Sequence, residues 1–386
     1  GGGIITLRLW LSLSGREFVF ALERAVTVMV IACPHALGLA IPLVAAASTS
    51  IAAGAGLLIR QRGPFEKARD IDVVMFDKTG TLTTGEFEVS EVVPFEDSAV
   101  KEDVLRAAAA VESESEHSIA RAIVAAVSDR PSVSDFNSIP GKGAEGVVDG
   151  KKIKVVSPGY LKENDIDYDK SRVEELSSRG DTVVYVLESD KLIAAIGLTD
   201  SVRPESKEAI GNLNERGIET QLITGDTEAV AARVAGELNI DQYFAGILPD
   251  QKAEKVKEVQ SQGKRVAMVG DGVNDAPALA QADLGVAIGT GTDIAAESAD
   301  VILVNDDPRD VLRLLDHSKA THAKMIQNLW WATGYNALAI PLAAGALYAW
   351  GILLNPAVGA LLMSLSTVIV AFNARLLKGA NQPDQD

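Results

Sequence analysis

Two long stretches of this chain contain no Asp, Glu, Lys or Arg, and they limit its fold more than any other feature. The first is Ala25–Ile59, with 35 residues, and the second is Met325–Ala374, with 50 residues. A helix needs about 20 apolar residues to cross a bilayer core. The first stretch therefore predicts one membrane span with a helical extension. The second predicts two spans, separated by a turn at Gly351 and Asn355-Pro356.

Basic residues follow the first stretch and lie on both sides of the second. They are Arg60, Arg62, Lys67, Arg69, Lys319, Lys324, Arg375 and Lys378. Because basic residues favour the cytoplasmic side of a membrane, all of these ends are expected in the cytoplasm. The sequence thus predicts an integral protein of the cell membrane, in contact with lipid, whose middle part is cytoplasmic. Residues 1–15 hold a shorter apolar piece, which we interpret as the remnant of an earlier helix.

The charge balance and the cysteine content exclude some classes of protein. Asp and Glu number 53 against 36 Lys and Arg, which gives a formal net charge of −17. So acidic a chain is a poor candidate for binding nucleic acid. The chain has a single cysteine, Cys33, so it cannot form an internal disulfide framework. Cys33 is therefore expected to be either a thiol packed in the core or a ligand.

The cytoplasmic part has the pattern of a doubly wound α/β domain interrupted by an insertion. Apolar strands are expected at 73–76, 220–223, 265–269, 284–287 and 300–303, with helices between the later ones. Residues 91–200 differ, with a helix expected at 101–127 and then short alternating segments, which predicts an α+β domain. We expect a membrane segment at 1–59, a catalytic domain at 60–90 and 201–318, the inserted domain at 91–200, two helices at 319–378 and a polar tail at 379–386.

The strand at 73–76 leads directly into the string Asp77-Lys78-Thr79-Gly80-Thr81. A carboxylate at the end of a parallel strand lies where ligands bind in α/β sheets. The amine, hydroxyls and backbone amides that follow suit a phosphoryl group and Mg²⁺.

Three later strings supply groups of the same kind. They are Thr224-Gly225-Asp226, Lys252 in a Pro-Asp-Gln-Lys string, and Asp271 with Asn274 and Asp275 in Gly-Asp-Gly-Val-Asn-Asp. Each string alone is common in loops, but their joint occurrence in this order predicts a phosphoryl-transfer site, which works by positioning and by neutralising charge.

These strings together resemble the heavy-metal P-type ATPases over nearly the whole chain. The resemblance implies a haloacid-dehalogenase-like catalytic domain in which Asp77 is phosphorylated by ATP. It further implies that Asp77, Asp271 and the carbonyl of Thr79 bind Mg²⁺. Lys252 and Thr224 would hold phosphoryl oxygens, and Asn274 and Asp275 would support the site.

In the insertion, Glu116-His117 and the glycines Gly141 and Gly143 are similar to the nucleotide motifs of that family. The resemblance implies that these four residues bind ATP. Without it, a surface histidine is more often simply solvated. Ser118-Ile119 depart from the Pro-Leu of the family motif, and the Gly-Asn expected near Lys154–Pro158 is absent.

The first apolar stretch contains Cys33-Pro34-His35, where the proline interrupts the helix and a thiolate and an imidazole stand side by side. Such ligands suit copper and related ions, although a proline kink with a packed cysteine is the plainer alternative. The later stretch adds Tyr335, Asn336, Met363 and Ser364, in strings that resemble the copper-transporting subgroup with this Cys-Pro-His motif. These six residues are the expected ligands or neighbours of a transported copper or silver ion.

The family also has earlier helices and an actuator domain with a Thr-Gly-Glu loop. Thr84-Gly85-Glu86 has those letters but falls in the strand after the phosphorylation loop, so we interpret it as coincidence. We therefore expect this chain to be the C-terminal portion of a copper exporter, with the N-terminal half as a partner and little turnover by itself. Two alternatives stay open: a membrane-tethered phosphatase, and a non-catalytic metal-binding fragment.

Overall fold

The computed structural model describes residues 1–13, 17–33, 35–96, 99–115, 117–271, 275–289 and 297–377. The chain divides into two compact units. Gly1–Arg69 with Arg313–Asp386 form the first, called here the helical unit, and Asp70–Leu312 form the second, called the two-sheet unit. The domain boundaries expected from the sequence stay predictions.

Six strands of the two-sheet unit pair in parallel, in the order β13-β12-β11-β2-β9-β10. They are β2 (Val73–Asp77), β9 (Glu219–Ile223), β10 (Gln242–Phe244), β11 (Val266–Gly270), β12 (Leu284–Ile288) and β13 (Val301–Leu303). Of these six strands, β2 comes first in the chain, yet it lies between β11 and β9. The parallel, helix-linked sheet confirms the expected doubly wound fold.

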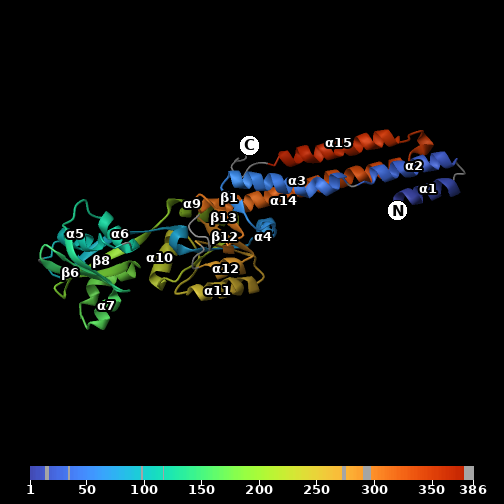
Figure 1. Cartoon of the computed structure of the whole chain (residues 1–386). Helices are drawn as coiled ribbons and strands as arrows, with labels where there is room; N and C mark the ends of the chain where they lie inside the picture. The colour runs from blue at the N-terminus through green and yellow to red at the C-terminus, as the bar shows by residue number, and fades with distance from the viewer. Residues whose placement is uncertain are drawn as a thin grey trace. The chain divides into compact units, whose positions relative to one another are not determined.

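Alternate residues of each strand point to opposite faces of this sheet, and helices cover the apolar residues there. Val73 and Met75 of β2 share a buried cluster with Val256 of α11 (Pro249–Ser261) and Leu279 of α12 (Ala276–Gln281). Two further helices, α9 (Pro204–Glu215) and α10 (Glu228–Leu238), also belong to this part of the unit (Figure 1). All five residues of β2 are buried, which fixes the position of Asp77 at its end.

The second sheet is antiparallel, in the order β3-β8-β7-β6-β5-β4. Its strands are β3 (Thr83–Pro94), β4 (Val133–Ile139), β5 (Gly143–Val148), β6 (Lys151–Val156), β7 (Thr182–Glu188) and β8 (Lys191–Val202). Three short helical elements lie between β6 and β7 in the chain: α7 (Pro158–Glu163), η3 (Lys170–Val173) and α8 (Glu174–Ser178). The mixed α+β character expected for the insertion is confirmed, and the string at 84–86 lies in β3, as expected.

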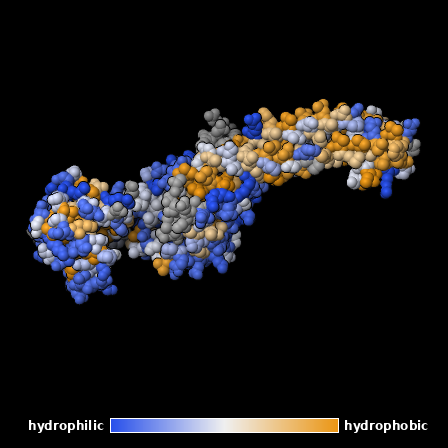
Figure 2. All heavy atoms as spheres, viewed as in Figure 1, coloured by the Kyte–Doolittle hydropathy of each residue, from blue (hydrophilic) through white to orange (hydrophobic). Residues whose placement is uncertain are grey.

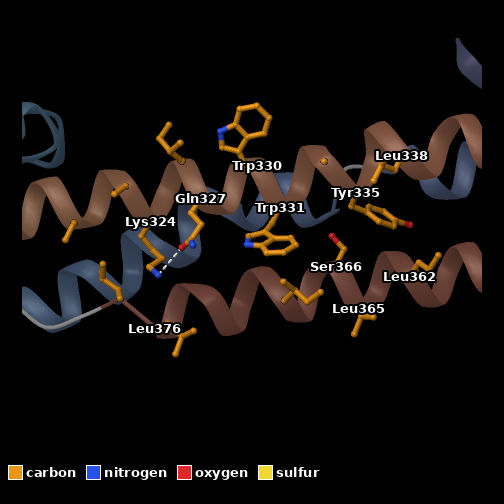
Figure 3. Close-up of a pocket in the computed structure, with 16 residues that line it drawn as sticks. Lys324, Gln327, Trp330, Trp331, Tyr335, Leu338, Leu362, Leu365, Ser366 and Leu376 are labelled. Atoms are coloured by element: carbon orange, nitrogen blue, oxygen red, sulfur yellow. Dashed lines mark hydrogen bonds between the residues drawn. The ribbon is translucent and has the colours of Figure 1, made fainter. Parts of the chain in front are cut away.

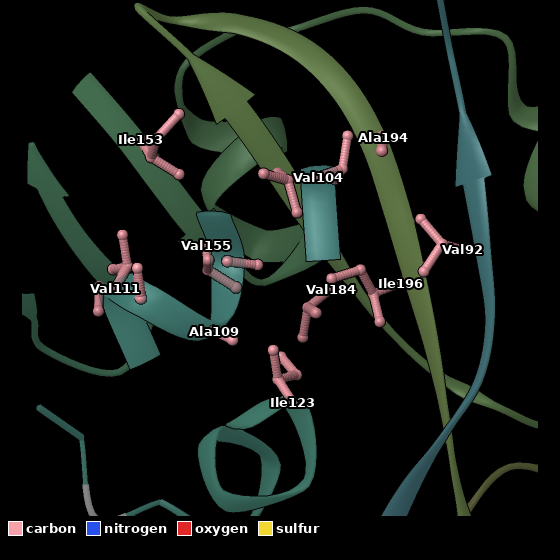
Figure 4. Close-up of a cluster of buried hydrophobic side chains, with 14 of the residues drawn as sticks. Val92, Val104, Ala109, Val111, Ile123, Ile153, Val155, Val184, Ala194 and Ile196 are labelled. Carbon is pink, nitrogen blue, oxygen red and sulfur yellow. The ribbon is translucent and has the colours of Figure 1, made fainter. Parts of the chain in front are cut away.

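One prediction for this sheet's helices is wrong. The expected single helix at 101–127 is two helices, α5 (Lys101–Glu112) and α6 (Ser118–Ala125). The Oγ of Ser113 donates to the carbonyl of Ala110, and the Nδ1 of His117 accepts from the amide of Ile119 at the start of α6. Such side-chain to backbone bonds compete with helix continuation. Both helices pack their apolar sides on the sheet, around Val111, Ile123 and Val155 (Figure 4).

The helical unit contains α1 (Gly2–Leu13), α2 (Phe18–Ile31), α3 (His35–Gly54) and α15 (Pro356–Arg375), with most of α14 (Arg309–Ala344). Two short segments, β1 (Leu57–Ile59) and α4 (Arg62–Lys67), follow α3. The 3₁₀ turn η4 (Tyr348–Trp350) and the left-handed Gly351 separate α14 from α15, near the expected turn. Figure 2 shows hydrophobic residues over the surface of these helices.

Two helical stretches among the described residues are long and apolar enough to cross a membrane, Phe18–Gly54 and Pro356–Arg375. The first begins seven residues before the expected span and includes the pair Glu23 and Arg24. The span expected in α14 does not reach the same hydropathy, because Gln327, Asn328 and Asn336 interrupt its apolar residues. The prediction of this span rested on the absence of charged residues alone and did not consider these uncharged polar side chains.

Candidate functional site

Asp77, Lys252 and Asp275 form a buried ion cluster at the carboxyl end of β2. The Nζ of Lys252 lies 2.6 Å from Oδ1 of Asp77 and 2.6 Å from Oδ1 of Asp275. Asp77 ends the central strand, Lys252 lies in the first turn of α11, and Asp275 directly precedes α12. All three side chains are nearly fully buried, so one ammonium group faces two carboxylates with little water present.

The burial of this cluster shifts its pKa values. Burial and the nearby Asp275 carboxylate raise the pKa of Asp77 to about 7, against the attraction of Lys252. Burial also raises the pKa of Asp275, again opposed by Lys252. For Lys252, burial acts to lower the pKa, but the two carboxylates outweigh it and the pKa is raised. Asp77 is therefore balanced between its acid and its ionised form near neutral pH, where a bound cation favours ionisation.

A second cluster surrounds Lys78, the residue after Asp77. Its Nζ lies 2.5 Å from Oδ2 of Asp226 and 3.6 Å from Oδ2 of Asp200. The hydroxyl of Thr224 donates to Oδ2 of Asp226 at 3.0 Å, and the Asp226 amide donates to the same hydroxyl oxygen at 3.1 Å. Gly225 stands between them, and a side chain there would come 3.4 Å from the carbonyl of Ile247. The structure thus joins the expected Thr-Gly-Asp string to the loop that begins at Lys78.

Two residues that hold this loop were missed by sequence reasoning. Asp200 accepts hydrogen bonds from the hydroxyl of Thr83 at 2.6 Å and from the amide of Gly85 at 3.1 Å. Arg203 donates to the carbonyl of Gly80 at 3.3 Å and to that of Thr83 at 3.0 Å. The sequence did offer a signal for these two residues. Asp200 and Arg203 are a charged pair three positions apart, at the point where β8 ends and α9 begins.

The residues expected to bind Mg²⁺ offer only oxygen atoms. Gly80 has a φ of +70°, and a Cβ at that position would lie 3.8 Å from the carboxylate of Asp271. The loop that carries Thr79 therefore faces Asp271 closely. In addition, Oδ2 of Asp275 is buried and accepts no hydrogen bond within the described chain. Carboxylate and carbonyl oxygens are what Mg²⁺ prefers, so the donor set fits this ion. Asn274 lies outside the described residues.

A cavity of about 420 Å³ in the antiparallel part brings together His117, Gly141 and Gly143. The ring of His117 caps α6 through its Nδ1, which fixes the ring's orientation. Gly141 has a φ of +70°, and a Cβ on Gly143 would lie 2.0 Å from the carbonyl of Val155. Only glycine fits at Gly143, which keeps this wall of the cavity flat. Glu116 lies outside the described residues.

Glu112 lines the same cavity, and sequence reasoning missed it. Its side chain is only 6% exposed at the end of α5. Burial raises the pKa of Glu112 to about 7, although a hydrogen bond with Ser115 opposes this. The signal was an acid directly after the buried run of three alanines and Val111, where a solvated glutamate is not expected. A carboxyl group that can be neutral at pH 7 can donate a hydrogen bond to a base.

In the helical unit, α2 ends at Ile31 and α3 begins at His35. The Sγ of Cys33 and the Nδ1 of His35 lie 2.9 Å apart in this break, so the two expected ligands do face each other. Pro34 lies outside the described residues. Cys33 is half-buried and its thiol is free.

The other four expected ion residues lie on α14 and α15. The Tyr335 hydroxyl donates to the carbonyl of Gly359 at 3.4 Å, and the Ser364 hydroxyl donates within its own helix to Ala360. Oδ1 of Asn336 is buried and has no partner within the described chain. Met363 is half-buried. The hydrogen bonds described for these residues do not join them to Cys33 or His35, so a six-residue ion site stays a prediction.

Asn328 ties three helices of this unit together. Its Nδ2 donates to the carbonyls of Ala40 at 3.2 Å and Val370 at 3.3 Å, and its Oδ1 accepts from Asn373 at 2.7 Å. The side chain is fully buried. Bonds of this kind between α3, α14 and α15 fix the helices against one another where apolar packing alone is weakly specific.

Residues 71–283 match the haloacid dehalogenase-like hydrolase family. A copper-exporting P-type ATPase B of Archaeoglobus fulgidus is 58% identical over 380 residues, which cover 97% of this chain and 54% of the relative. The chain belongs to the P-type ATPases of this hydrolase family. A copper-exporting P-type ATPase B of Enterococcus hirae is 47% identical, over 97% of this chain and 51% of the relative. The chain therefore spans about half the length of these curated relatives.

Solved structures of P-type ATPases have the same fold. A zinc-transporting PIB-type ATPase in an E2·Pi state matches 97% of this chain and 62% of its own, with a TM-score of 0.81 at 31% identity. The catalytic domain of a CPx-ATPase, studied for its changes upon nucleotide binding, matches 68% of this chain and 96% of its own, with a TM-score of 0.56 at 32% identity. Both are described as ATPases, and the first as zinc-transporting, which agrees with the enzyme class expected from the sequence.

Proposed function

We propose that this protein takes part in ATP-driven export of copper or silver ions, with Asp77 as the residue that is phosphorylated. The observation that carries the proposal is the buried contact of Lys252 with Asp77 and Asp275 at the end of the central strand. A buried carboxylate beside an ammonium group suits a nucleophile, because the ammonium stabilises the ionised carboxylate until a phosphate binds.

In the proposed reaction, an oxygen of ionised Asp77 attacks the terminal phosphorus of ATP and ADP leaves with the electrons of the broken P–O bond. Lys252 is positioned to neutralise charge on the transferring group, because its Nζ already contacts the attacking carboxylate. Thr224 presents its hydroxyl beside Asp226, near the ammonium of Lys78. Mg²⁺, held by Asp77, Asp271 and the carbonyl of Thr79, would neutralise phosphate oxygens when bound.

For the nucleotide itself, the 420 Å³ cavity offers a flat glycine wall, a fixed imidazole and a carboxyl group that can be neutral. A flat polar ring can stack on or hydrogen bond to adenine, and close backbone approach needs residues without Cβ. We infer that His117, Gly141, Gly143 and Glu112 receive the base of ATP, with Glu116 as a further candidate.

For the ion, Cys33 and His35 supply a soft sulfur and an imidazole nitrogen in a helix break, which suits copper and silver. The cytoplasmic side of the bilayer would lie next to the basic residues that follow α3, which places the ATP site in the cytoplasm and the helices in the cell membrane. The part of the relatives that this chain does not span is the proposed partner segment that completes the ion path.

The test is phosphorylation of the full chain by γ-labelled ATP. Asp77→Asn keeps the size of the side chain but removes the nucleophile, so acid-stable label on the protein should disappear. Asp241→Asn changes an exposed carboxylate of the same domain and should label like the unmodified chain. Label that persists in Asp77→Asn would reject the assignment. Release of inorganic phosphate from small phosphomonoesters, with no ATP-derived label, would favour a phosphatase instead.

A further inference from the structure

The helical unit contains a groove of about 1120 Å³ between α14 and α15. Its walls are mostly apolar or aromatic, and Lys324 is the charged residue among those that line it. In Figure 3, Trp331, Tyr335 and Ser366 lie in the space between the two helices. Trp330 and Leu338 are 74% and 73% exposed beside the groove, so its rim is apolar as well.

One end of the groove is cationic. The Nζ of Lys324 donates a hydrogen bond to Oε1 of Gln327 at 3.1 Å (Figure 3). Because this partner is an uncharged amide, it does not neutralise the positive charge of Lys324. Met325 and Ala374 share one buried cluster, which places the adjoining Lys324 and Arg375 at the same level of the two helices. Leu376 and Leu377, directly after Arg375, line the groove next to this end.

The length and polarity of the groove match one leaflet of a bilayer. From Lys324 to Leu338 the groove follows α14 for about 21 Å, at the helical rise per residue. Half of a hydrocarbon core is about 15 Å thick, so this length holds an acyl chain plus the region of its headgroup. Tryptophan prefers the boundary between these regions, and both indoles lie within two turns of Lys324.

We propose that an anionic phospholipid of the cytoplasmic leaflet binds in this groove. Its phosphate lies at Lys324, and an acyl chain runs past Trp331 toward Leu338. Charge complementarity favours this occupant, because a phospholipid combines an anionic headgroup with apolar chains, as the groove combines Lys324 at one end with apolar walls. The inference concerns a lipid site, and it rests on the proposed membrane location but on neither the phosphorylation nor the ion chemistry.

The experiment measures tryptophan quenching in the full chain, held in mixed micelles, during titration with phospholipids that carry brominated acyl chains. Brominated phosphatidylglycerol should quench at a lower mole fraction than phosphatidylcholine with the same chains. Lys324→Gln should weaken the phosphatidylglycerol effect about five-fold, the size expected for one basic residue at a lipid surface. Trp331→Phe should remove most of the specific signal.

Two variants separate the groove from general contact with lipid. A Cβ on Gly334, which lines the groove, meets no atom within 4 Å, so Gly334→Leu can fill the groove without a clash at the backbone and should reduce quenching by both lipids. Lys67→Gln removes an exposed cation outside the groove and should change nothing. An unchanged lipid preference in Lys324→Gln would overturn the proposal. A dimer seen by light scattering that Gly334→Leu dissociates would also overturn it, since a second copy would then occupy the groove.

Discussion

The ammonium group of Lys252 contacts the carboxylate of Asp77 at 2.6 Å, although the two residues are 175 positions apart in the chain. The same ammonium contacts Asp275 at the same distance. Burial away from water raises the pKa of Asp77, and repulsion by the Asp275 carboxylate adds to this rise, in spite of the cationic neighbour.

Replacing Lys252 should affect both chemistry and stability. In Lys252→Gln, phosphorylation from labelled ATP should fall by about 100-fold, as for the loss of one well-placed electrostatic group. The melting temperature at pH 8 should fall as well, because the buried carboxylates lose their counter-ion. Lys255→Gln is the matched control, since Lys255 lies on the same helix, is about a third exposed and pairs with Glu258. Equal phosphorylation rates in the Lys252 and Lys255 variants would contradict the role of Lys252.

The pKa of Asp77 predicts a specific dependence of stability on pH. The pKa is about 7 in the folded protein and 3.8 in the unfolded chain, so the folded state binds the proton more tightly. The stability that this proton provides is complete below about pH 4 and is lost as the pH rises through 7. Asp77→Asn cannot lose a proton, so its melting temperature relative to the unmodified chain should increase from pH 5.5 to pH 8.5 in Mg²⁺-free buffer. A difference that stays constant over this range would show that Asp77 titrates normally.

The cavity of about 420 Å³ that we propose as the nucleotide site should depend on two polar side chains, His117 and Glu112. His117→Ala in the full chain should weaken ATP binding by about 1–3 kcal/mol, the range of one stacking or hydrogen-bond contact. Because the pKa of Glu112 is raised to about 7, its carboxyl group is mostly protonated at pH 6 and can donate a hydrogen bond to the base, so ATP affinity should fall from pH 6 to pH 8 and Glu112→Gln should reduce this fall. Glu102→Gln, an exposed position on the same helix, should keep the variation of the unmodified chain. Calorimetry that gives identical pH profiles for both glutamate variants would remove Glu112 from the site.

The roles proposed for Cys33, His35 and Met363 in ion binding can be distinguished, because sulfur and nitrogen ligands prefer different ions. Cys33→Ser removes the thiolate and should abolish copper or silver binding to the helical unit, whereas His35→Cys should shift the preference toward monovalent ions. Met363→Leu should weaken binding if its thioether contributes, and Met29→Leu, at an exposed position of α2, is its control. The measurement is metal stoichiometry of the purified chain by atomic absorption. Unchanged stoichiometry in Cys33→Ser would leave this cysteine as a packing residue.

The sequence by itself was enough to place most of the parallel sheet and its chemistry. Strands β2, β9, β11, β12 and β13 lie within one residue of the expected ranges, because buried parallel strands are short, apolar and bounded by polar loops. The strings at Asp77, Thr224 and Asp271 follow directly after such strands, so their place at one edge of the sheet follows from local pattern alone. The interruption between Ile31 and His35 was likewise predicted, from the proline in the Cys-Pro-His string.

Only the tertiary structure decided which of these groups meet and which charges are buried. Asp200 and Arg203 contact the segment after Asp77 through hydrogen bonds between parts far apart in the chain. Glu112 lines the 420 Å³ cavity because the folded chain buries its side chain there. The end of the helix expected at 101–127 depended on side-chain bonds of Ser113 and His117 to the backbone, which compete with a pattern that otherwise favours one helix. A pKa depends on the solvent and charges around a group, and only the folded chain brings Asp275 and Lys252 to Asp77.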